Sequence, residues 1–570
     1  MSQFTSDAQS YPKAPTRDRL YTRWGHLKTE RATWWAHWQE LSTYLLPRSG
    51  RFFVQDRNKG WRRHNSIYDN TGTRALKVLG AGMMAGATSP ARPWFRMMTG
   101  DPELAKYQPV RIWLDEVGKL MQMVFQKSNT YRALHSMYEE LGVFGTAATI
   151  LLPNFNNVIH NYSLTAGEYC VATDYQGQVC TLYREYERPV SEVVKEFGYK
   201  NCSEHVRNLY DRGSLDQWIR IIHAIEPRAD RDINKLDNKN MAWGSYHFEI
   251  GARDNQFLRE SGFKRFPGLV PRWAVAGGDI YGHSPGMECL GDIKQLQHEQ
   301  LRKAQGIDFK SNPPIQVPTS LKNREVDRLP GGVTYFDPSS PQSGVKSLFE
   351  VNIDLNHLLQ DIQDVRGRVN SSFYTDMFLM LSNGADQRMT ATEVAERHEE
   401  KLLMLGPVLE RLHNELLTPL IETTFQTMIE SGIVPPAPQE MHGMELNVEF
   451  ISMLAQAQKA VGANSIDRFV GNLGAVAQFK PEALDKFDAD AWVDAYSDML
   501  GVDPSLIVAG DKVAMVRQQR AQAQQQQVQM AQAEQQAKIS KDLASAKTTE
   551  PSALTNVIDM FSGYNTPQAM

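Results

Sequence analysis

Residues 354–431 constrain the fold more than any other part of the chain, because they contain two long segments with helical hydrophobic periodicity. In the first segment, apolar residues recur at steps of three and four, which places them on one face of a helix. They are Leu355, Leu358, Leu359, Ile362, Val365 and Val369. The second segment opens at Thr390, which has the spacing of a capping box with Glu393, and its apolar stripe continues to Gly432. A helix of that length would extend about 60 Å at about 1.5 Å per residue. It needs neighbours along its length, which either the rest of a large α-rich subunit or further copies of the chain could supply.

The two helical segments are separated by residues 373–389, where the helical period is lost. Phe373 and residues 377–381 form an almost continuous apolar run, and Ser382-Asn383-Gly384 favours a turn. We therefore predict a flexible joint here. Pro407 and Pro419 lie within the second stripe and predict kinks, because proline lacks an amide donor and crowds the preceding helical turn.

The composition is that of a large globular protein without a membrane anchor. The chain has 570 residues, 41% hydrophobic and 22% charged, which is enough for three or more domains. It contains no run of about eighteen apolar residues and no secretory signal at its N-terminus, so we expect synthesis and function in a reducing cytoplasm. The four cysteines are scattered and lack the spacing of a zinc site or a disulfide framework.

Charge is distributed unevenly along the chain. The formal net charge of -5 argues against a protein that wraps nucleic acid by bulk attraction. Residues 1–100 nevertheless carry 16 Lys and Arg against 6 Asp and Glu, whereas residues 440–511 carry 4 against 12. This asymmetry suggests faces that meet different partners, and ordinary surface variation is the alternative explanation.

The N-terminal half of the chain combines amphipathic helices with short strands, which predicts an α+β, mostly helical fold. Small residues from Gly80 to Gly86 would let another backbone approach closely, and the loop from Pro90 to Phe95 would be anchored by its buried rings. We predict helices over residues 17–46, 65–86, 110–125 and 131–144, a strand over 145–152, and an antiparallel α+β region over 166–189 and 218–271.

A second pair of helices brackets a short region rich in Pro, Gly and Ser. The first helix is predicted over residues 286–309, with Lys294, Arg302 and Lys303 on the face opposite its apolar stripe, and Asn312-Pro313-Pro314 ends it. Short apolar runs up to residue 349 suggest a small β-rich excursion, and residues 350–372 form the returning helix. The pattern predicts an antiparallel helical stem that carries a compact tip.

The C-terminal part of the chain is acidic and then rich in glutamine. Short helices are predicted over residues 448–461, 465–478, 481–484 and 488–500. Residues 512–546 favour helix by composition, but their apolar stripe is too thin for a core. This segment is either a helix stabilised by copies of itself or a low-complexity tail, and residues 548–570 are expected to be mobile.

The catalytic motifs that match by letter fail on physical grounds. Residues 282–286 fit GxSxG around Ser284, but Pro285 has no amide to donate to an oxyanion. Residues 80–85 fit GxGxxA within a helical pattern, where close helix packing explains the glycines better. His298 and His398 have no second histidine in helical register. We therefore expect no catalytic residues, no metal and no cofactor.

Taken in order, the motifs resemble one family, the portal or head-to-tail connector proteins of short-tailed phages. The resemblance covers residues 17–431, and each motif is weak alone. The motifs are Asp69-Asn70-Thr71-Gly72 with the following helix to Gly86, the loop from Pro90 to Phe95, Phe144-Gly145-Thr146-Ala147-Ala148, Tyr281-Gly282 with Pro285-Gly286, Gly291-Asp292-Ile293-Lys294, Asn312-Pro313-Pro314, and Met389-Thr390-Ala391-Thr392-Glu393-Val394.

The resemblance implies a subunit of a ring, expected to be a dodecamer, at a single capsid vertex of the virion. Genomic double-stranded DNA would pass through the ring during packaging and ejection, and assembly would take place in the host cytoplasm. The implied partners are the terminase large subunit, tail adaptor or tail tube proteins, and the major capsid and scaffolding proteins. The implied regions are a flexible N-terminus (1–14), wing (15–285), first stem helix (286–309), clip (310–349), second stem helix (350–372), tunnel loop (373–389), long wing helix (390–434), crown (435–511), a possible helical barrel (512–547) and a flexible tail (548–570).

The same resemblance implies three groups of site residues. The tunnel loop would present Phe378, Leu379, Met380, Asn383, Gly384, Gln387 and Arg388. The charged stem face, touching DNA, a neighbouring subunit or only solvent, would present Lys294, Arg302 and Lys303. The clip, as docking surface for terminase and adaptor, would present Lys322, Arg324, Glu325, Asp327 and Arg328. Two other hypotheses stay open: a cytoplasmic nucleic-acid-binding scaffold that uses the basic N-terminal region, and an enzyme with an unfamiliar site around Ser284.

Overall fold

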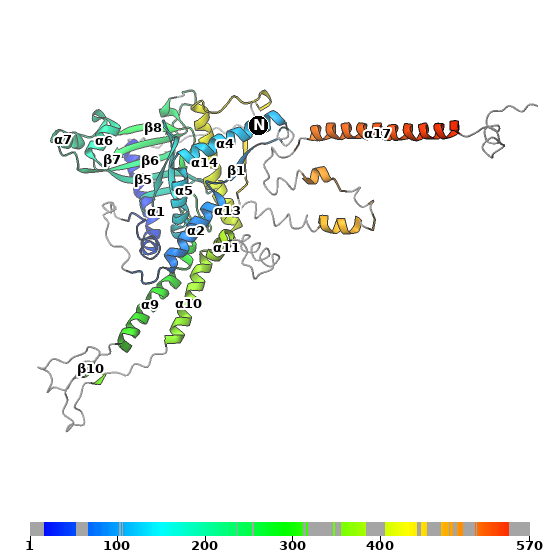
Figure 1. Ribbon diagram of the computed structural model, residues 1–570. Helices are drawn as coiled ribbons and strands as arrows, with labels where there is room; N and C mark the ends of the chain where they lie inside the picture. Colours follow the sequence, from blue (N-terminus) through cyan, green and yellow to red (C-terminus); the bar gives the residue numbers. More distant parts are fainter. Residues whose placement is uncertain are drawn as a thin grey trace, which may run out of the picture. The chain divides into compact units, whose positions relative to one another are not determined.

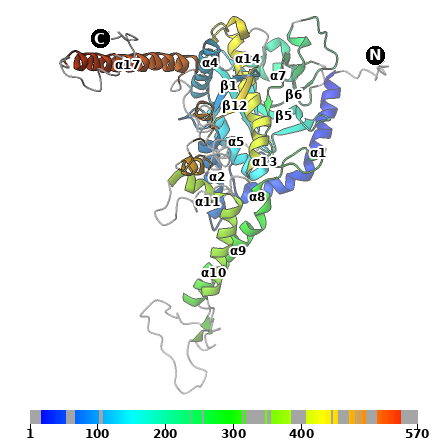
Figure 2. The same ribbon diagram turned by 90° about the vertical axis from the view of Figure 1, so that its right-hand side faces the viewer.

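The structure is a computed structural model, and it divides the chain into two compact units, Met1–Lys486 and Phe487–Met570. It describes residues 16–52, 66–101, 104, 107–235, 237–252, 256–311, 315–316, 346–347, 355–383, 405–441, 446–452, 469–477, 479–480, 482, 487–493, 508 and 510–545. Figures 1 and 2 show the described elements from two directions.

Four N-terminal helices contribute much of the main core. Their apolar stripes face one another, and two glycine contacts bring α2 and α5 close together, because a Cβ at Gly80 would lie 2.9 Å from Cγ of Glu139 and one at Gly142 would lie 2.6 Å from Leu79. This agrees with the close packing predicted for residues 80–86. The predicted loop anchor is confirmed as well, since Trp94 and Phe95 are buried. The helices are α1 (Thr16–Tyr44), α2 (Thr71–Ala87), α4 (Gln108–Lys127) and α5 (Thr130–Phe144).

Most strands of the first unit belong to two antiparallel sheets, so the fold is α+β as predicted. One sheet has the order β3-β2-β9 and the other is a meander with the order β4-β5-β6-β7-β8. The strands are β2 (Ala148–Asn154), β3 (Val158–Leu164), β4 (Tyr169–Thr173), β5 (Val179–Pro189), β6 (Trp218–Pro227), β7 (Trp243–Glu249), β8 (Arg259–Phe263) and β9 (Gly268–Leu269).

The five-stranded sheet is covered on both faces. Ile222 and Ala224 of β6 pack with the N-terminal half of α1, whereas Ile219 and Ile221 pack with α6 (Val190–Phe197) and α7 (Glu204–Asp211). This division follows from the alternation of side chains along a strand.

Two buried histidines lie side by side in this sheet. The rings of His223 and His247 are stacked with their centroids 3.8 Å apart. Nε of Arg184 donates to Nδ1 of His223 at 3.2 Å, and Nε2 of His223 lies 2.9 Å from Oγ of Ser245. Because Arg184 needs an acceptor at Nδ1, His223 is held neutral with its proton on Nε2.

A pair of helices projects from the rest of the first unit, as predicted for residues 286–372. α9 (Leu290–Ser311) follows the short α8 (Pro285–Glu288), and α10 (Leu355–Ser372) runs back beside α9. Figures 1 and 2 both show the two helices side by side. Beyond their far ends, β10 (Ile315–Gln316) pairs with β11 (Lys346–Ser347) in antiparallel register. This arrangement agrees with a helical stem that carries a β-containing tip.

The predicted joint at residues 373–389 is described up to Asn383 and is largely helical there. The chain changes direction at Tyr374, whose φ is +54°, and then forms the helix α11 (Thr375–Asn383). Within residues 373–389, therefore, the part up to Asn383 is mostly helical. The sequence pattern did not reveal this helix, because adjacent apolar residues do not repeat at steps of three and four. The structure shows that α11 buries the neighbours Met377 and Phe378 together.

The long helix predicted from Thr390 is described from Gly406 onward, and its proposed start at Thr390 lies outside the described residues. It consists of α13 (Gly406–Leu412), a π-helical turn η4 (His413–Leu417) and α14 (Thr418–Glu430). Pro419 explains the wide turn, because it cannot donate to the carbonyl of Glu415 and its ring crowds that carbonyl. The helix thus departs from regular α-helical geometry just before Pro419, one of the two positions where a kink was predicted. The other, Pro407, lies in the first turn of α13, where proline is tolerated.

The prediction of a helix over residues 448–461 is wrong at its beginning. Leu446–Phe450 forms the strand β12, which pairs with β1 (Phe95–Thr99) in antiparallel register. The second unit contains the long helix α17 (Gly510–Ser545), close to the predicted bounds, and Arg517 of α17 donates to Asp490 at 2.7 Å.

Candidate functional site

The base of the α9–α10 pair is fastened to the N-terminus of α2 by one buried carboxylate. The side chain of Asp69 is 3% exposed. Its Oδ2 accepts from NH2 of Arg366 on α10 at 2.7 Å and from Nε2 of Gln300 on α9 at 2.9 Å, while Oδ1 accepts from the amide of Thr71 at 2.8 Å. Gln297 adds a second link, because its Oε1 accepts from the backbone amides of Tyr68 and Asp69.

The electrostatics of Asp69 match this role as a hub. Burial alone would raise the pKa of the carboxyl, but the hydrogen bonds from Thr71 and Arg366 outweigh burial and hold the pKa below its usual value. Asp69 therefore stays ionised, and its charge binds three elements together.

The structure places the three predicted cationic residues of the stem in different surroundings. Lys294 forms an ion pair with Glu40 of α1, so it is engaged within its own subunit. Arg302 is exposed and its Nε lies 3.4 Å from Nε2 of His298 on the same helix. Lys303 is half-buried. The three side chains thus do not form a single uniform cationic face.

The structure also places the predicted tunnel-loop residues in different surroundings. Phe378 is 4% exposed and packs against Gly82 of α2, so it belongs to the core and is removed from the predicted lining. Leu379, the next residue of α11, is 42% exposed. Met380 and Asn383 lie in α11. Gly384, Gln387 and Arg388 lie outside the described residues.

The predicted clip residues belong to a segment that the structure does not describe. Lys322, Arg324, Glu325, Asp327 and Arg328 all lie outside the described residues, between β10 and β11.

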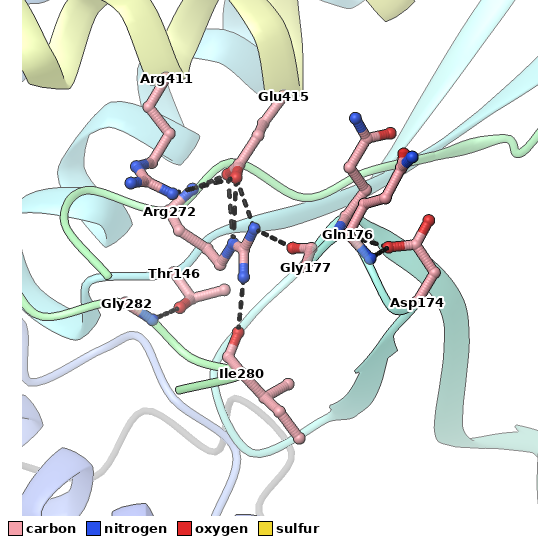
Figure 3. A network of polar contacts seen from close by, with 10 residues as sticks. Thr146, Asp174, Gln176, Gly177, Arg272, Ile280, Gly282, Arg411 and Glu415 are labelled. Atoms are coloured by element: carbon pink, nitrogen blue, oxygen red, sulfur yellow. Dashed lines mark hydrogen bonds and ion pairs between the residues drawn. The ribbon is translucent and has the colours of Figure 1, made fainter. Parts of the chain in front are cut away.

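A network that the sequence did not predict centres on Arg272 and Glu415 (Figure 3). Arg272 is 4% exposed, and NH2 donates to Oε1 of Glu415 at 2.6 Å and to the carbonyl of Gly177 at 2.7 Å. The amide of Arg272 donates to Oε2 of Glu415 at 2.8 Å, and NH1 reaches the carbonyl of Ile280 at 3.4 Å. The pair therefore connects the π-helical turn to the β4–β5 turn and to the loop after β9. These residues are far apart in the sequence, and no motif marks them.

The serine of the GxSxG sequence has a structural role. Ser284 is 1% exposed, its Oγ donates to the carbonyl of Val143 at 2.7 Å, and it accepts from the amide of Met287 as the N-cap of α8. Both hydrogen-bonding functions of the hydroxyl are thus used. Within the part of the chain that the structure describes, no group of three or more His, Cys, Asp or Glu side chains could hold a metal ion. In the same part, no helix is both long and apolar enough to span a bilayer.

Comparisons with known proteins find relatives over nearly the whole chain. The family model described as "Bacteriophage head to tail connecting protein" matches residues 17–508. A probable portal protein of Bordetella phage BPP-1 is 63% identical over 548 residues, which cover 96% of this chain and 99% of the relative. The portal protein of Salmonella phage epsilon15 is 45% identical over 542 residues, which cover 95% of this chain and 98% of the relative.

Solved structures are matched at much lower similarity. A chain from the virion of a native gene transfer agent particle is 10% identical, with a TM-score of 0.34, and the match covers 82% of this chain and 99% of that chain. At this TM-score the likeness supports no statement about the site.

Proposed function

We propose that this chain, which belongs to the bacteriophage head-to-tail connecting proteins, the portal proteins, forms a ring at a single capsid vertex of the virion. The ring serves as the conduit through which genomic DNA is packaged and ejected. The observation that carries the proposal is similarity to portal proteins over nearly the full length, together with the projecting α9–α10 pair. The ring is a dodecamer, it is assembled in the host cytoplasm, and it has no enzymatic activity of its own.

The regions of the subunit keep the roles given by the resemblance. α9 and α10 form the stem, and residues 310–349 between them form the clip. Residues 15–285 and 390–434 form the wing, 435–511 the crown and 512–547 the barrel helix. The tunnel loop is the part of residues 379–389 that follows the buried Phe378, with Leu379, Met380, Asn383, Gly384, Gln387 and Arg388 as its lining.

The charges of the stem suit a conduit in which DNA slides. Lys294 is paired with Glu40, Arg366 with Asp69, and Arg368 with Asp292 at 3.2 Å. Cations that are neutralised within the subunit attract phosphates weakly, whereas adhesive binding needs many free cations. On this proposal, the exposed Arg302 is the stem residue best placed to meet DNA or a neighbouring subunit.

The clip docks the terminase large subunit during packaging and the tail adaptor or tail tube proteins afterwards. Lys322, Arg324, Glu325, Asp327 and Arg328 supply the charged contacts. The outer regions of the ring meet the major capsid protein and the scaffolding protein. The hypothesis of a cytoplasmic nucleic-acid-binding scaffold is set aside, because the relatives that match nearly the whole chain are portal proteins.

The tunnel-loop assignment is tested by deleting residues 383–386 and, as a matched control, replacing the same four residues by Ser-Gly-Ser-Gly. The deletion shortens the loop, so we expect rings to form but filled heads to lose DNA, with a smaller loss for the replacement. DNA per head and DNA retained after purification are the measurements. Unchanged filling and retention in the deletion variant would remove this role.

The clip assignment is tested by a variant in which a short Gly-Ser linker replaces residues 318–344. Rings should still form, because the α9–α10 pair is retained, but pull-down of the terminase large subunit and of the tail adaptor should be lost. Retention of both interactions would count against the clip as the docking surface.

A further inference from the structure

Helix α2 contacts α10 and α11 on either side of the break between them. α10 ends at Ser372 and α11 begins at Thr375, and Tyr374 between them has a φ of +54°. This backbone region is unfavourable for a bulky residue that is not glycine, so it is held by surrounding contacts. α2 supplies contacts to both helices.

The first contact is ionic and lies at the start of α2. Arg366 of α10 donates from Nε and NH2 to Oδ2 of Asp69, at 3.1 and 2.7 Å. The same carboxylate accepts from the amide and the hydroxyl of Thr71 in the first turn of α2. A buried charge with this many donors fixes the position of α10 over the end of α2.

The second contact is steric and lies near the other end of α2. The ring of Phe378 rests on Gly82, where any side chain would overlap the ring and where a Cβ would lie 2.7 Å from Cβ of Phe378. Phe378 is 4% exposed, so its contact with Gly82 is shielded from solvent. Only glycine leaves room for α11 at this distance.

We infer that α2 sets the angle between α10 and α11, with Asp69 and Gly82 as its two positioning residues. Asp69 lies just before the first turn of α2, and Gly82 lies about 16 Å along the helix from Thr71, at about 1.5 Å per residue, so each holds one arm of the bend. The bend fixes the position of the C-terminal end of α11. The consequence for DNA rests on the proposed function, because there α11 leads into the tunnel loop.

Hydrogen–deuterium exchange of the full-length assembled protein tests the inference without DNA. Gly82→Ala should speed exchange in residues 375–383 by roughly fivefold or more, because α11 loses its contact with Gly82, and leave residues 218–227 of the sheet unchanged. In the double variant Gly82→Ala with Phe378→Ala, the overlap with the ring is gone but the close approach of the two Cβ atoms at 2.7 Å remains. Exchange in residues 375–383 should therefore fall from the Gly82→Ala rate part of the way toward the wild-type rate. Gly118→Ala in α4, where a Cβ meets nothing within 4 Å, is the matched control and should have no effect.

Asp69→Asn tests the other contact and also covers the case in which Gly82→Ala fails to fold. It should speed exchange in residues 366–383, whereas Glu422→Gln, which weakens an exposed ion pair with Arg265, should not. Wild-type exchange over residues 375–383 in both Gly82→Ala and Asp69→Asn would overturn the inference, as would an equal rise in residues 218–227. If α11 loosens but DNA retention is unchanged, the inference holds and the proposed role of the tunnel loop fails.

Discussion

Arg272 and Glu415 form a buried ion pair whose cost of disruption can be compared with that of an exposed pair in the same molecule. Glu415→Gln leaves the guanidinium of Arg272 buried without a counter-charge, and breaking such a pair costs about 3–5 kcal/mol. Glu422→Gln disrupts a pair whose side chains are 58% and 47% exposed, which costs under about 1 kcal/mol. We expect thermal unfolding to show a midpoint several degrees lower for Glu415→Gln alone. Equal midpoints for the two variants would mean that the Arg272 network does not hold its loops together.

The stacked histidines of the five-stranded sheet predict acid sensitivity. Burial lowers the pKa of both His223 and His247 well below the usual value, and the nearby positive charges of Arg184 and Arg259 lower both pKa values further. Above about pH 6.5 the histidines are neutral in both states and contribute no pH dependence. As the pH falls below that value, the unfolded chain takes up protons that the folded sheet cannot, so stability decreases.

The variant His247→Phe keeps a ring in the stack but removes one titrating group. Between pH 7.5 and pH 5, the midpoint of thermal unfolding should fall by less in this variant than in wild type. His205→Phe, at an exposed position of α7, is the control and should leave the loss unchanged. An unaltered pH dependence in His247→Phe would show that the buried pair does not control acid stability.

At the scale of elements, the pairing of β1 with β12 joins residues that lie between 347 positions (Thr99 and Leu446) and 355 positions (Phe95 and Phe450) apart in the sequence. The amide of Ile451 donates to the carbonyl of Trp94 at 3.0 Å, so the pair Glu449–Arg96, two residues further along, is also a hydrogen-bonded pair. Glu449→Pro removes its amide donor, and we expect exchange of residues 95–99 to become faster. Glu449→Gln keeps the amide and should behave as wild type. Slow exchange in Glu449→Pro would contradict the importance of this pairing.

The sequence predicted those elements whose partners are local or whose stripe is regular. The helices α2, α5, α9 and α10 follow from their apolar periods, and β2 follows from the glycine turn before it. β12 was mistaken for helix because its alternation over Leu446, Val448 and Phe450 is short and its partner strand is remote. The small residues from Gly80 to Gly86 predicted a close approach to this helix but not that Phe378 would make it, and the Arg272–Glu415 pair had no sequence signal. Both contacts depend on residues that only the fold brings together.

At the scale of the whole molecule, the neutralised stem cations predict weak binding of DNA. Assembled protein should bind duplex DNA no more tightly than about 10⁻⁶ M at physiological salt, the range of purely non-specific contacts. Filter binding or fluorescence anisotropy over a salt series measures this. Glu40→Gln should release Lys294 and strengthen binding at low salt, whereas Glu422→Gln, away from the stem, should not. Tight binding by the wild-type assembly would be at odds with a sliding conduit.

The central claim is that copies of this chain surround a channel, and electron microscopy of the purified full-length protein combined with native mass spectrometry tests it most directly. The account predicts annular particles with a central hole and a mass close to twelve times 64.6 kDa. Compact single subunits, with no annular particles under any solution condition, would contradict it.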